Sequence, residues 1–318
     1  MNTPPDSLRI AFAQANPTVG DVAGNLERAR AAHGEAAAMD ADLLVFPELF
    51  LAGYPPEDLV LKGAFTEACR AALEALAPAT AGGAPAILVG LPWREDDTVF
   101  NAVALLDGGR IEALRHKVIL PNYDVFDEKR VFAEGPMPGP VNVRGVRIGV
   151  PICEDIWVED VVECLAETGA ELLVVPNGSP WYRGKHEVRL QVALARVVES
   201  GLPLLYVNQL GGQDELVFDG GSFALGADRR LAALAPGFSG GTFLTEWRRD
   251  GAGWRCAAGP MDRVVEGEEA EWRACVLGLK DYVDKNGFPG VVLGLSGGID
   301  SAISAAIAVD ALGAERVH

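Results

Sequence analysis

The chain has 318 residues, enough for one large domain or two of ordinary size, and 49% of them are hydrophobic, so a substantial core can form. A formal net charge of −18 argues against a general binder of nucleic acid or of anionic membranes, which needs a basic surface. No apolar run approaches the roughly 20 residues that cross a bilayer, and no secretory signal is visible at the start. The five cysteines are scattered without a C-x-x-C pair, which argues against a disulfide framework or a zinc ribbon and favours the cytoplasm.

Strand and helix patterns alternate through most of the chain. Short apolar or alternating runs predict strands at 8–13, 41–46, 86–91, 100–106, 110–117, 146–150, 170–175, 203–207 and 222–225. Helical spacing predicts helices at 25–39, 65–76, 158–168 and 186–200. Glycine pairs at 211–212 and 220–221 bound a further hairpin region. This order predicts an α/β protein with two layers of sheet covered by helices.

The composition changes toward the end of the chain. The charged segment 245–268 reads as a connector, and 272–282 as an amphipathic helix. Next come a predicted buried strand (V-V-L-G-L), a glycine turn and a helix (S-A-I-S-A-A-I-A). Because one strand–turn–helix unit cannot bury its own faces, we expect the first part of a truncated second domain here. The expected division is residues 1–262 and residues 263–318.

One stretch, G-V-P-I-C-E-D-I-W at 149–157, carries a reactive residue where a strand ends. Pro151 interrupts the strand because proline has no N–H to donate, and Cys153 follows beside Glu154 and Asp155. Taken alone, a cysteine in this composition is more often a buried structural residue than a nucleophile.

Two earlier segments also place charged side chains at expected strand ends. F-P-E-L-F-L-A-G-Y-P-P-E-D-L contains Glu48, and R-H-K-V-I-L-P-N-Y-D-V-F-D-E-K-R-V-F contains Lys117. Together with the Cys153 segment they resemble the nitrilase superfamily, whose Glu-Lys-Cys triad occurs in this chain order. The closer resemblance is to the glutaminase domain of glutamine-dependent NAD synthetases. It extends over P-N-G-S-P-W-Y-R-G-K-H-E-V-R and V-N-Q-L-G-G-Q-D-E-L-V-F-D-G-G-S-F, and so covers nearly the whole chain.

The resemblance implies a nitrilase-like four-layer α-β-β-α sandwich in residues 1–262 and a role for each matched residue. Amide hydrolysis needs a deprotonated thiol, which Lys117 as a nearby cation is expected to favour. Glu48 would transfer the proton, and Lys117 with the backbone N–H of Glu154 would stabilise the oxyanion. Glu128 matches an accessory glutamate.

Three further residues match positions that bind glutamine in these relatives: Tyr123, Ser179 and Lys185. For Ser179, plain turn chemistry in N-G-S-P remains an equally good interpretation of the residues alone. Asp124 stands where glycine is common in these relatives, which puts the loop near Tyr123 in doubt.

The last glycine turn, L-S-G-G-I-D-S, lies between a predicted strand and a predicted helix, so it presents free N–H groups to an anion. It lacks the G-K-[ST] of a Walker A loop and resembles the pyrophosphate loop of ATP-pyrophosphatases. The alternative is an ordinary tight turn. The resemblance implies ATP contacts from eight residues: Gly294, Leu295, Ser296, Gly297, Gly298, Ile299, Asp300 and Ser301. It associates Asp300 with Mg²⁺.

The two resemblances fit one reaction. Glutamine would supply ammonia, and ATP would activate deamido-NAD for conversion to NAD with release of AMP and pyrophosphate, in a homo-oligomer. The chain as given is expected to hydrolyse glutamine only. One alternative is a free-standing nitrilase-type amidase or carbamoylase, against which the glycine turn counts. Another is a non-catalytic regulatory subunit, against which the Glu48, Lys117 and Cys153 set counts.

Overall fold

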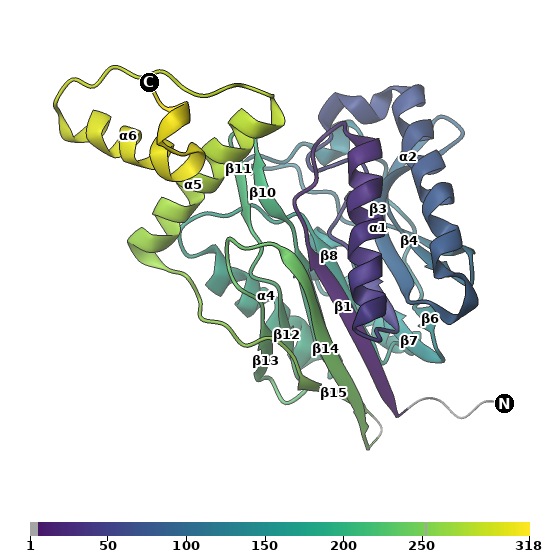
Figure 1. The fold of residues 1–318 in the computed structure, drawn as a ribbon. Helices are drawn as coiled ribbons and strands as arrows, with labels where there is room; N and C mark the ends of the chain where they lie inside the picture. The colour runs from purple at the N-terminus through teal and green to yellow at the C-terminus, as the bar shows by residue number, and fades with distance from the viewer. Residues whose placement is uncertain (1–5, 252) are drawn as a thin grey trace.

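The first of two β-sheets has seven strands. The computed structural model describes residues 6–251 and 253–318. The strands of this sheet are β1 (Ser7–Gln14), β2 (Leu43–Val45), β3 (Ala86–Glu95), β4 (Thr98–Asp107), β5 (Arg110–His116), β14 (Gly241–Asp250) and β15 (Gly253–Ala258). Their order is β15-β14-β1-β2-β3-β4-β5, with β1, β2 and β3 parallel. Helices α1 (Val22–Ala38) and α2 (Gly63–Leu76) lie on its outer face (Figure 1).

The second sheet has six strands and its own pair of helices. Its strands are β6 (Val141–Val143), β7 (Val146–Gly149), β8 (Leu172–Asn177), β9 (Leu204–Asn208), β12 (Phe223–Leu225) and β13 (Leu231–Leu234). Their order is β13-β12-β9-β8-β7-β6. Helices α3 (Asp160–Glu167) and α4 (Lys185–Ser200) pack on this sheet through a separate apolar cluster.

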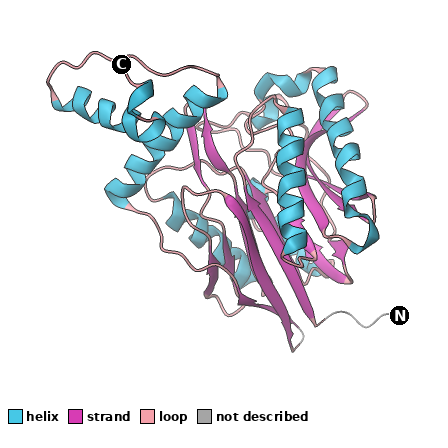
Figure 2. Ribbon diagram, in the orientation of Figure 1, coloured by secondary structure: helices cyan, strands magenta, loops and turns pink. Residues whose placement is uncertain are grey.

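The main core lies between the two sheets. Phe12 of β1, Ile148 of β7 and Trp247 of β14 are all fully buried in one cluster that draws on both sheets. Figure 2 shows the strands sandwiched between helices. The predicted four-layer α-β-β-α sandwich is therefore confirmed.

The remaining elements lie beside the sandwich. They are the hairpin β10 (Leu210–Gln213) and β11 (Leu216–Asp219), the helices α5 (Gly267–Lys285) and α6 (Ile299–Leu312), and the short 3₁₀ helices η1 (Glu57–Leu61), η2 (Ala77–Gly83), η3 (Glu128–Arg130), η4 (Cys153–Ile156) and η5 (Ala314–Arg316). Figure 1 shows α5 next to β10 and β11, and α6 (yellow) packed against α5. No helix in the described part of the chain has both the length and the apolar character that a membrane crossing requires.

The prediction of a connector at 245–268 is wrong for its first half. Residues 241–250 and 253–258 form the paired strands β14 and β15, and β14 pairs with β1 over the whole length of β1. Trp247 and Trp254 are buried at 0% and 2% exposure, so burial of these two rings outweighs the many charged residues of the segment.

The strand predicted at 291–295 is also wrong. Val291 forms only an isolated bridge to Val317, while Val292 and Leu295 are 85% and 68% exposed. A strand needs backbone partners along its length, and here residues 291–293 pair only with 316–318. The helix predicted at 272–282 does form, but it extends over Gly267–Lys285.

Candidate active site

Cys153 lies in a strained turn at the carboxyl end of β7. It is the first residue of η4, it has a φ of +46°, and it is 4% exposed. A non-glycine residue holds a positive φ only where its surroundings enforce it. Asp155 enforces the turn: its carboxylate accepts the backbone N–H of Ile152 at 2.8 Å, and those of Val118 and Ile119 at 3.0 and 2.8 Å. The cysteine turn is thus tied to the segment that follows Lys117.

Lys117 lies between two carboxylates. It directly follows β5 and is fully buried. Its Nζ donates to Oε1 of Glu48 at 2.7 Å and to both carboxylate oxygens of Glu128 at 2.9 Å. The structure therefore joins three of the predicted residues in one buried ionic cluster.

Glu48 is held on several sides. It follows β2 and is fully buried. Besides the contact with Lys117, Oε1 accepts Nδ2 of Asn101 at 2.8 Å, and Oε2 accepts the backbone N–H of Gly178 at 2.9 Å. A Cβ at Gly178 would lie 2.9 Å from the ring of Tyr54, so only glycine lets this backbone approach Glu48. The hydroxyl of Tyr54 in turn donates to Glu128 at 2.9 Å.

The charges of this cluster set the protonation state of Cys153. Burial opposes the Lys117 ammonium, but Glu128 and Glu48 outweigh burial and raise its pKa well above the usual value. Burial raises the pKa of Glu128 to about 7, against the attraction of Lys117. Burial and the charge of Glu48 raise the pKa of the Cys153 thiol well above its ordinary range, and the opposing effect of Lys117 is smaller.

Lys117 acts in the expected direction, because its charge lowers the pKa of the Cys153 thiol, but burial and the charge of Glu48 raise that pKa by more. The Lys117 charge is shared between two carboxylates, and the net effect of the surroundings is a raised pKa for the Cys153 thiol, which favours its neutral form. A neutral thiol beside a fixed carboxylate still suits nucleophilic attack, provided that the carboxylate takes the proton as the bond forms.

The three residues predicted to bind glutamine differ in exposure. Tyr123 is 45% exposed, and its hydroxyl donates to Oε1 of Glu154 at 2.8 Å. Its neighbour Asp124 has a φ of +50°, a conformation that favours glycine and that aspartate tolerates. Lys185 is 6% exposed, with its Nζ 4.6 and 4.7 Å from the ring centres of Trp157 and Tyr182. Burial, followed by the charge of Arg189, lowers the pKa of Lys185.

Ser179 is fixed by Arg189, which sequence reasoning missed. Nε of Arg189 donates to the Ser179 hydroxyl at 3.0 Å, and Nη2 donates to the Ser179 carbonyl at 2.7 Å. Arg189 is fully buried and paired with Asp219 at 2.8 Å. An arginine inside the buried stripe of α4 is the signal that could have identified it. Asn101 and Asp155 were missed in the same way, as polar residues at buried positions.

The glycine turn before α6 is open to solvent. Gly297 has a φ of +84°, Gly298 precedes the first residue of the helix, and a Cβ at Gly294 or Gly297 would meet no atom within 4 Å. The Ser301 hydroxyl donates to the Gly298 carbonyl at 3.0 Å. The backbone N–H of Gly298 donates to the Ser296 hydroxyl at 3.4 Å. Backbone N–H groups in an open turn at a helix start suit a phosphate. In residues 6–251 and 253–318, no three His, Cys, Asp or Glu side chains gather as metal ligands.

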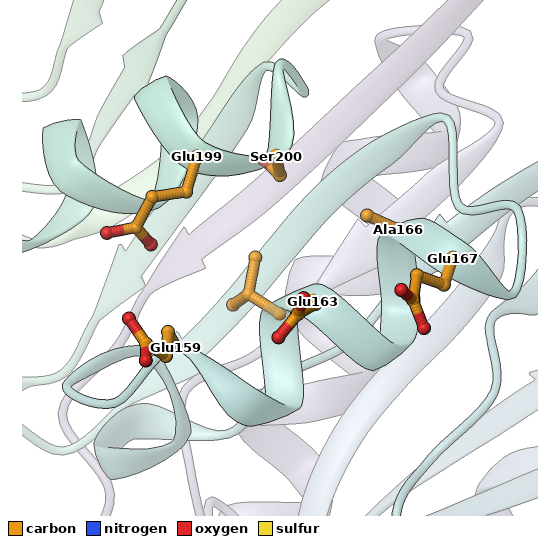
Figure 3. A pocket seen from close by; sticks show the side chains of 7 residues that line it. Glu159, Glu163, Ala166, Glu167, Glu199 and Ser200 are labelled. Atoms are coloured by element: carbon orange, nitrogen blue, oxygen red, sulfur yellow. The ribbon is translucent and has the colours of Figure 1, made fainter.

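A hollow on the outer surface lies apart from these residues. It lies between α3 and α4, and four glutamates lie along it: Glu159, Glu163, Glu167 and Glu199 (Figure 3). None of the residues predicted for catalysis or for binding lines it. The candidate site is the buried cluster around Cys153.

Comparison with known proteins agrees with this geometry. Residues 9–253 match the family model described as carbon-nitrogen hydrolase, and residues 271–318 match the one described as NAD synthase. The glutamine-dependent NAD(+) synthetase of Rhodobacter capsulatus is 49% identical over 98% of this chain and 56% of its own length. The chain thus spans little more than half of this curated relative.

Solved structures of an NAD⁺ synthetase and of an amidase also resemble the chain. A glutamine-dependent NAD⁺ synthetase from Acinetobacter baumannii, in complex with ADP, is 37% identical with a TM-score of 0.92, over 98% of this chain and 59% of that one. An amidase from Nesterenkonia sp. is 27% identical with a TM-score of 0.69, over 78% of this chain and 93% of that one. By its fold and by the match over residues 9–253, the chain belongs to the carbon-nitrogen hydrolase family, and a segment similar to NAD synthase follows at 271–318.

Proposed function

We propose that the chain hydrolyses the side-chain amide of glutamine through a thioester on Cys153. The observation that carries the proposal is the Lys117 ammonium, shared by Glu48 and Glu128 at 2.7–2.9 Å, near enough to Cys153 that the charges of all three residues act on its buried thiol. Such a cluster supplies the three functions that amide hydrolysis needs: a nucleophile, a proton carrier and a cation for the oxyanion.

The proposed steps follow from these positions. Glu48 accepts the thiol proton as Sγ of Cys153 bonds to the amide carbon, and the carbonyl oxygen becomes an oxyanion. Nζ of Lys117 and the backbone N–H of Glu154 stabilise that oxyanion; losing one such donor typically costs about 3 kcal/mol. The protonated Glu48 then gives its proton to the leaving nitrogen, the C–N bond breaks, and ammonia leaves. Glu48 next takes a proton from a water as the water oxygen bonds to the thioester carbon. The C–S bond then breaks, Glu48 returns that proton to Sγ of Cys153, and glutamate leaves.

Selection of glutamine rests on charges near the mouth of the site. Glutamine carries an α-carboxylate and an α-ammonium beyond its side-chain amide. We assign the carboxylate to the Lys185 ammonium, which is held between two aromatic rings, and the ammonium to Glu154. Tyr123 positions Glu154 through its hydroxyl, and Ser179 completes the pocket.

The ammonia would be used by a second activity that involves the glycine turn. We propose that residues 294–301 bind the phosphates of ATP, which activates deamido-NAD so that ammonia displaces AMP and yields NAD and pyrophosphate. Mg²⁺, when bound, would neutralise negative charge on the phosphates. The exposed Asp300 carboxylate, in the first turn of α6, fits one ligand of such an ion. Assembly as a homo-oligomer is part of the same proposal.

The test is ammonia release from glutamine and from a panel of neutral amides. Wild-type chain should prefer glutamine, Cys153→Ala should release none, and Cys275→Ala, which changes an exposed thiol, should match the wild type. None of the three proteins should form NAD from deamido-NAD, ATP and glutamine, because only residues 271–318 match NAD synthase. Formation of NAD by the 318-residue chain would refute that last expectation.

A second candidate function is a free-standing amidase, favoured by the similarity to the Nesterenkonia amidase along 93% of that chain. It predicts faster turnover of neutral amides than of glutamine. Absence of ammonia release from every amide would instead support the third candidate, a regulatory subunit without catalysis.

A further inference from the structure

Helix α5 is fixed to β10 by one buried carboxylate and one lysine. Asp281 is 6% exposed, and its Oδ2 accepts the backbone N–H of Gly212 at 2.7 Å and Nδ2 of Asn16 at 2.6 Å. One turn later, Nζ of Lys285 donates to the Gly212 carbonyl at 2.8 Å and to the Pro17 carbonyl at 3.0 Å. The helix thus binds both polar backbone groups of one β10 residue.

The helix also lies directly on the hairpin. A Cβ at Gly212 would come 2.9 Å from Cα of Gly278, and a Cβ at Gly278 would come 3.1 Å from Cγ2 of Val217 in β11. Glycine at both positions therefore lets the backbone of α5 approach the hairpin closely, with no space for a side chain between them.

The same hairpin holds the segment that carries Ser179. The carbonyl of Val217 accepts the backbone N–H of Trp181 at 2.7 Å. Asp219, the last residue of β11, accepts Nη1 of Arg189 at 2.8 Å, and Arg189 binds the hydroxyl and the carbonyl of Ser179. Arg189 is fully buried, so it needs Asp219 in place to remain paired.

We propose that Asp281 and Lys285 are positioning residues for the amide pocket. The first helix of the segment similar to NAD synthase sets the place of Ser179 through β10, β11 and Arg189. This inference rests on the proposed function and adds a physical link between the two units. By reciprocity, any event that moves α5 changes the affinity for the amide, and binding of the amide resists movement of α5.

The test compares three variants of the 318-residue chain. Asp281→Ala removes the shared acceptor, Asp281→Asn keeps an acceptor oxygen, and Asp284→Ala removes a carboxylate of the same helix that pairs with Arg316 instead. We expect Asp281→Ala to raise KM for glutamine about tenfold with kcat nearly unchanged, since a lost buried hydrogen bond to a charge is worth roughly that factor. Amide exchange at Gly212 and Trp181 should accelerate.

The controls separate positioning from general stability. Asp281→Asn should restore most of the affinity, and Asp284→Ala should leave KM and both exchange rates unchanged. Equal effects of Asp281→Ala and Asp284→Ala, or an unchanged KM in folded Asp281→Ala, would overturn the proposal. If Asp281→Ala does not fold, Lys285→Met tests the hydrogen bonds that Lys285 donates to the carbonyls of Gly212 and Pro17. If the wild type hydrolyses no glutamine, the proposed function fails, while exchange at Trp181 still tests the positioning.

Discussion

Replacing Glu128 by glutamine should slow ammonia release and remove a pH step. In the wild type, Lys117 divides its charge between Glu48 and Glu128, so Glu48 remains available as a base. In Glu128→Gln the ammonium pairs with Glu48 alone, and Glu48 becomes a weaker base. The glutamine side chain introduced at position 128 keeps an acceptor oxygen for the Tyr54 hydroxyl, so the packing around the site is retained.

The magnitude follows from the Lys117–Glu128 separation of 2.9 Å. At an effective dielectric constant of about 20, two unit charges at that distance attract by roughly 6 kcal/mol before desolvation. If stronger pairing of Lys117 with Glu48 makes up about half of this lost attraction, roughly 2–3 kcal/mol is left as an increase in the activation free energy. That corresponds to a fall in kcat of roughly 30- to 150-fold above pH 7.

The raised pKa of Glu128 determines whether kcat rises or falls with pH. Burial raises the pKa of Glu128 to about 7, so its carboxylate is neutral below that pH and charged above it. Wild-type kcat should therefore rise as the pH increases through 7, and the Glu128→Gln profile should lack that step. Steady-state ammonia release from pH 5.5 to 8.5 measures both, with Glu134→Gln, an exposed carboxylate, as the matched control. A step near pH 7 that persists in Glu128→Gln, or a kcat within threefold of wild type at pH 8, would refute the reasoning.

Two further changes test other parts of the site. Because burial and Glu48 raise the pKa of Cys153, its alkylation by iodoacetamide should be slow at pH 7 and should still accelerate above pH 9. The exposed Cys275 should react faster at pH 7. Mass spectrometry of the two cysteine-containing peptides measures both rates, and equal rates at pH 7 would contradict the raised pKa. Gly178→Ala places a Cβ 2.9 Å from the Tyr54 ring, so it should lower stability by about 1–3 kcal/mol and reduce kcat. Gly63→Ala, where a Cβ meets nothing within 4 Å, is its control, and equal melting temperatures of the two variants would argue against a tight approach.

Clear periodicity in the strands and helices predicted an α/β protein with two layers of sheet, and the resemblance to the nitrilase superfamily implied the four-layer sandwich. Prediction from periodicity failed at 245–258 because charged residues alternate there with Trp247 and Trp254, and their partner β1 lies at the other end of the chain. At 291–295 the error is the reverse, because a strand was predicted where none forms. That run is as apolar as a buried strand, but local pattern does not show whether a neighbouring strand is present to pair with it.

In the site, too, some residues could be predicted from the sequence and others could not. Glu48, Lys117 and Cys153 could be predicted because they follow strands in recognisable motifs. Asn101 lies on the inward face of β4, where only its contact with Glu48 reveals its role. The raised pKa of the Cys153 thiol could not be predicted either, because it depends first on burial and then on the distances to Glu48 and Lys117, which residue types alone do not give.

The pairing of β1 with β14 has a consequence for synthesis of the protein. The Thr245 hydroxyl donates to the Ile10 carbonyl across a sequence separation of 235 residues. At 5–20 residues per second, a ribosome needs roughly 10–50 s to make that much chain. Until then the edge of β1 that β14 will occupy lacks its partner, and Leu8, Ile10 and Phe12 lack the cover of Trp247. Completion of the first sheet is therefore a late event in folding, and the nascent chain is open to aggregation through β1 for most of its synthesis.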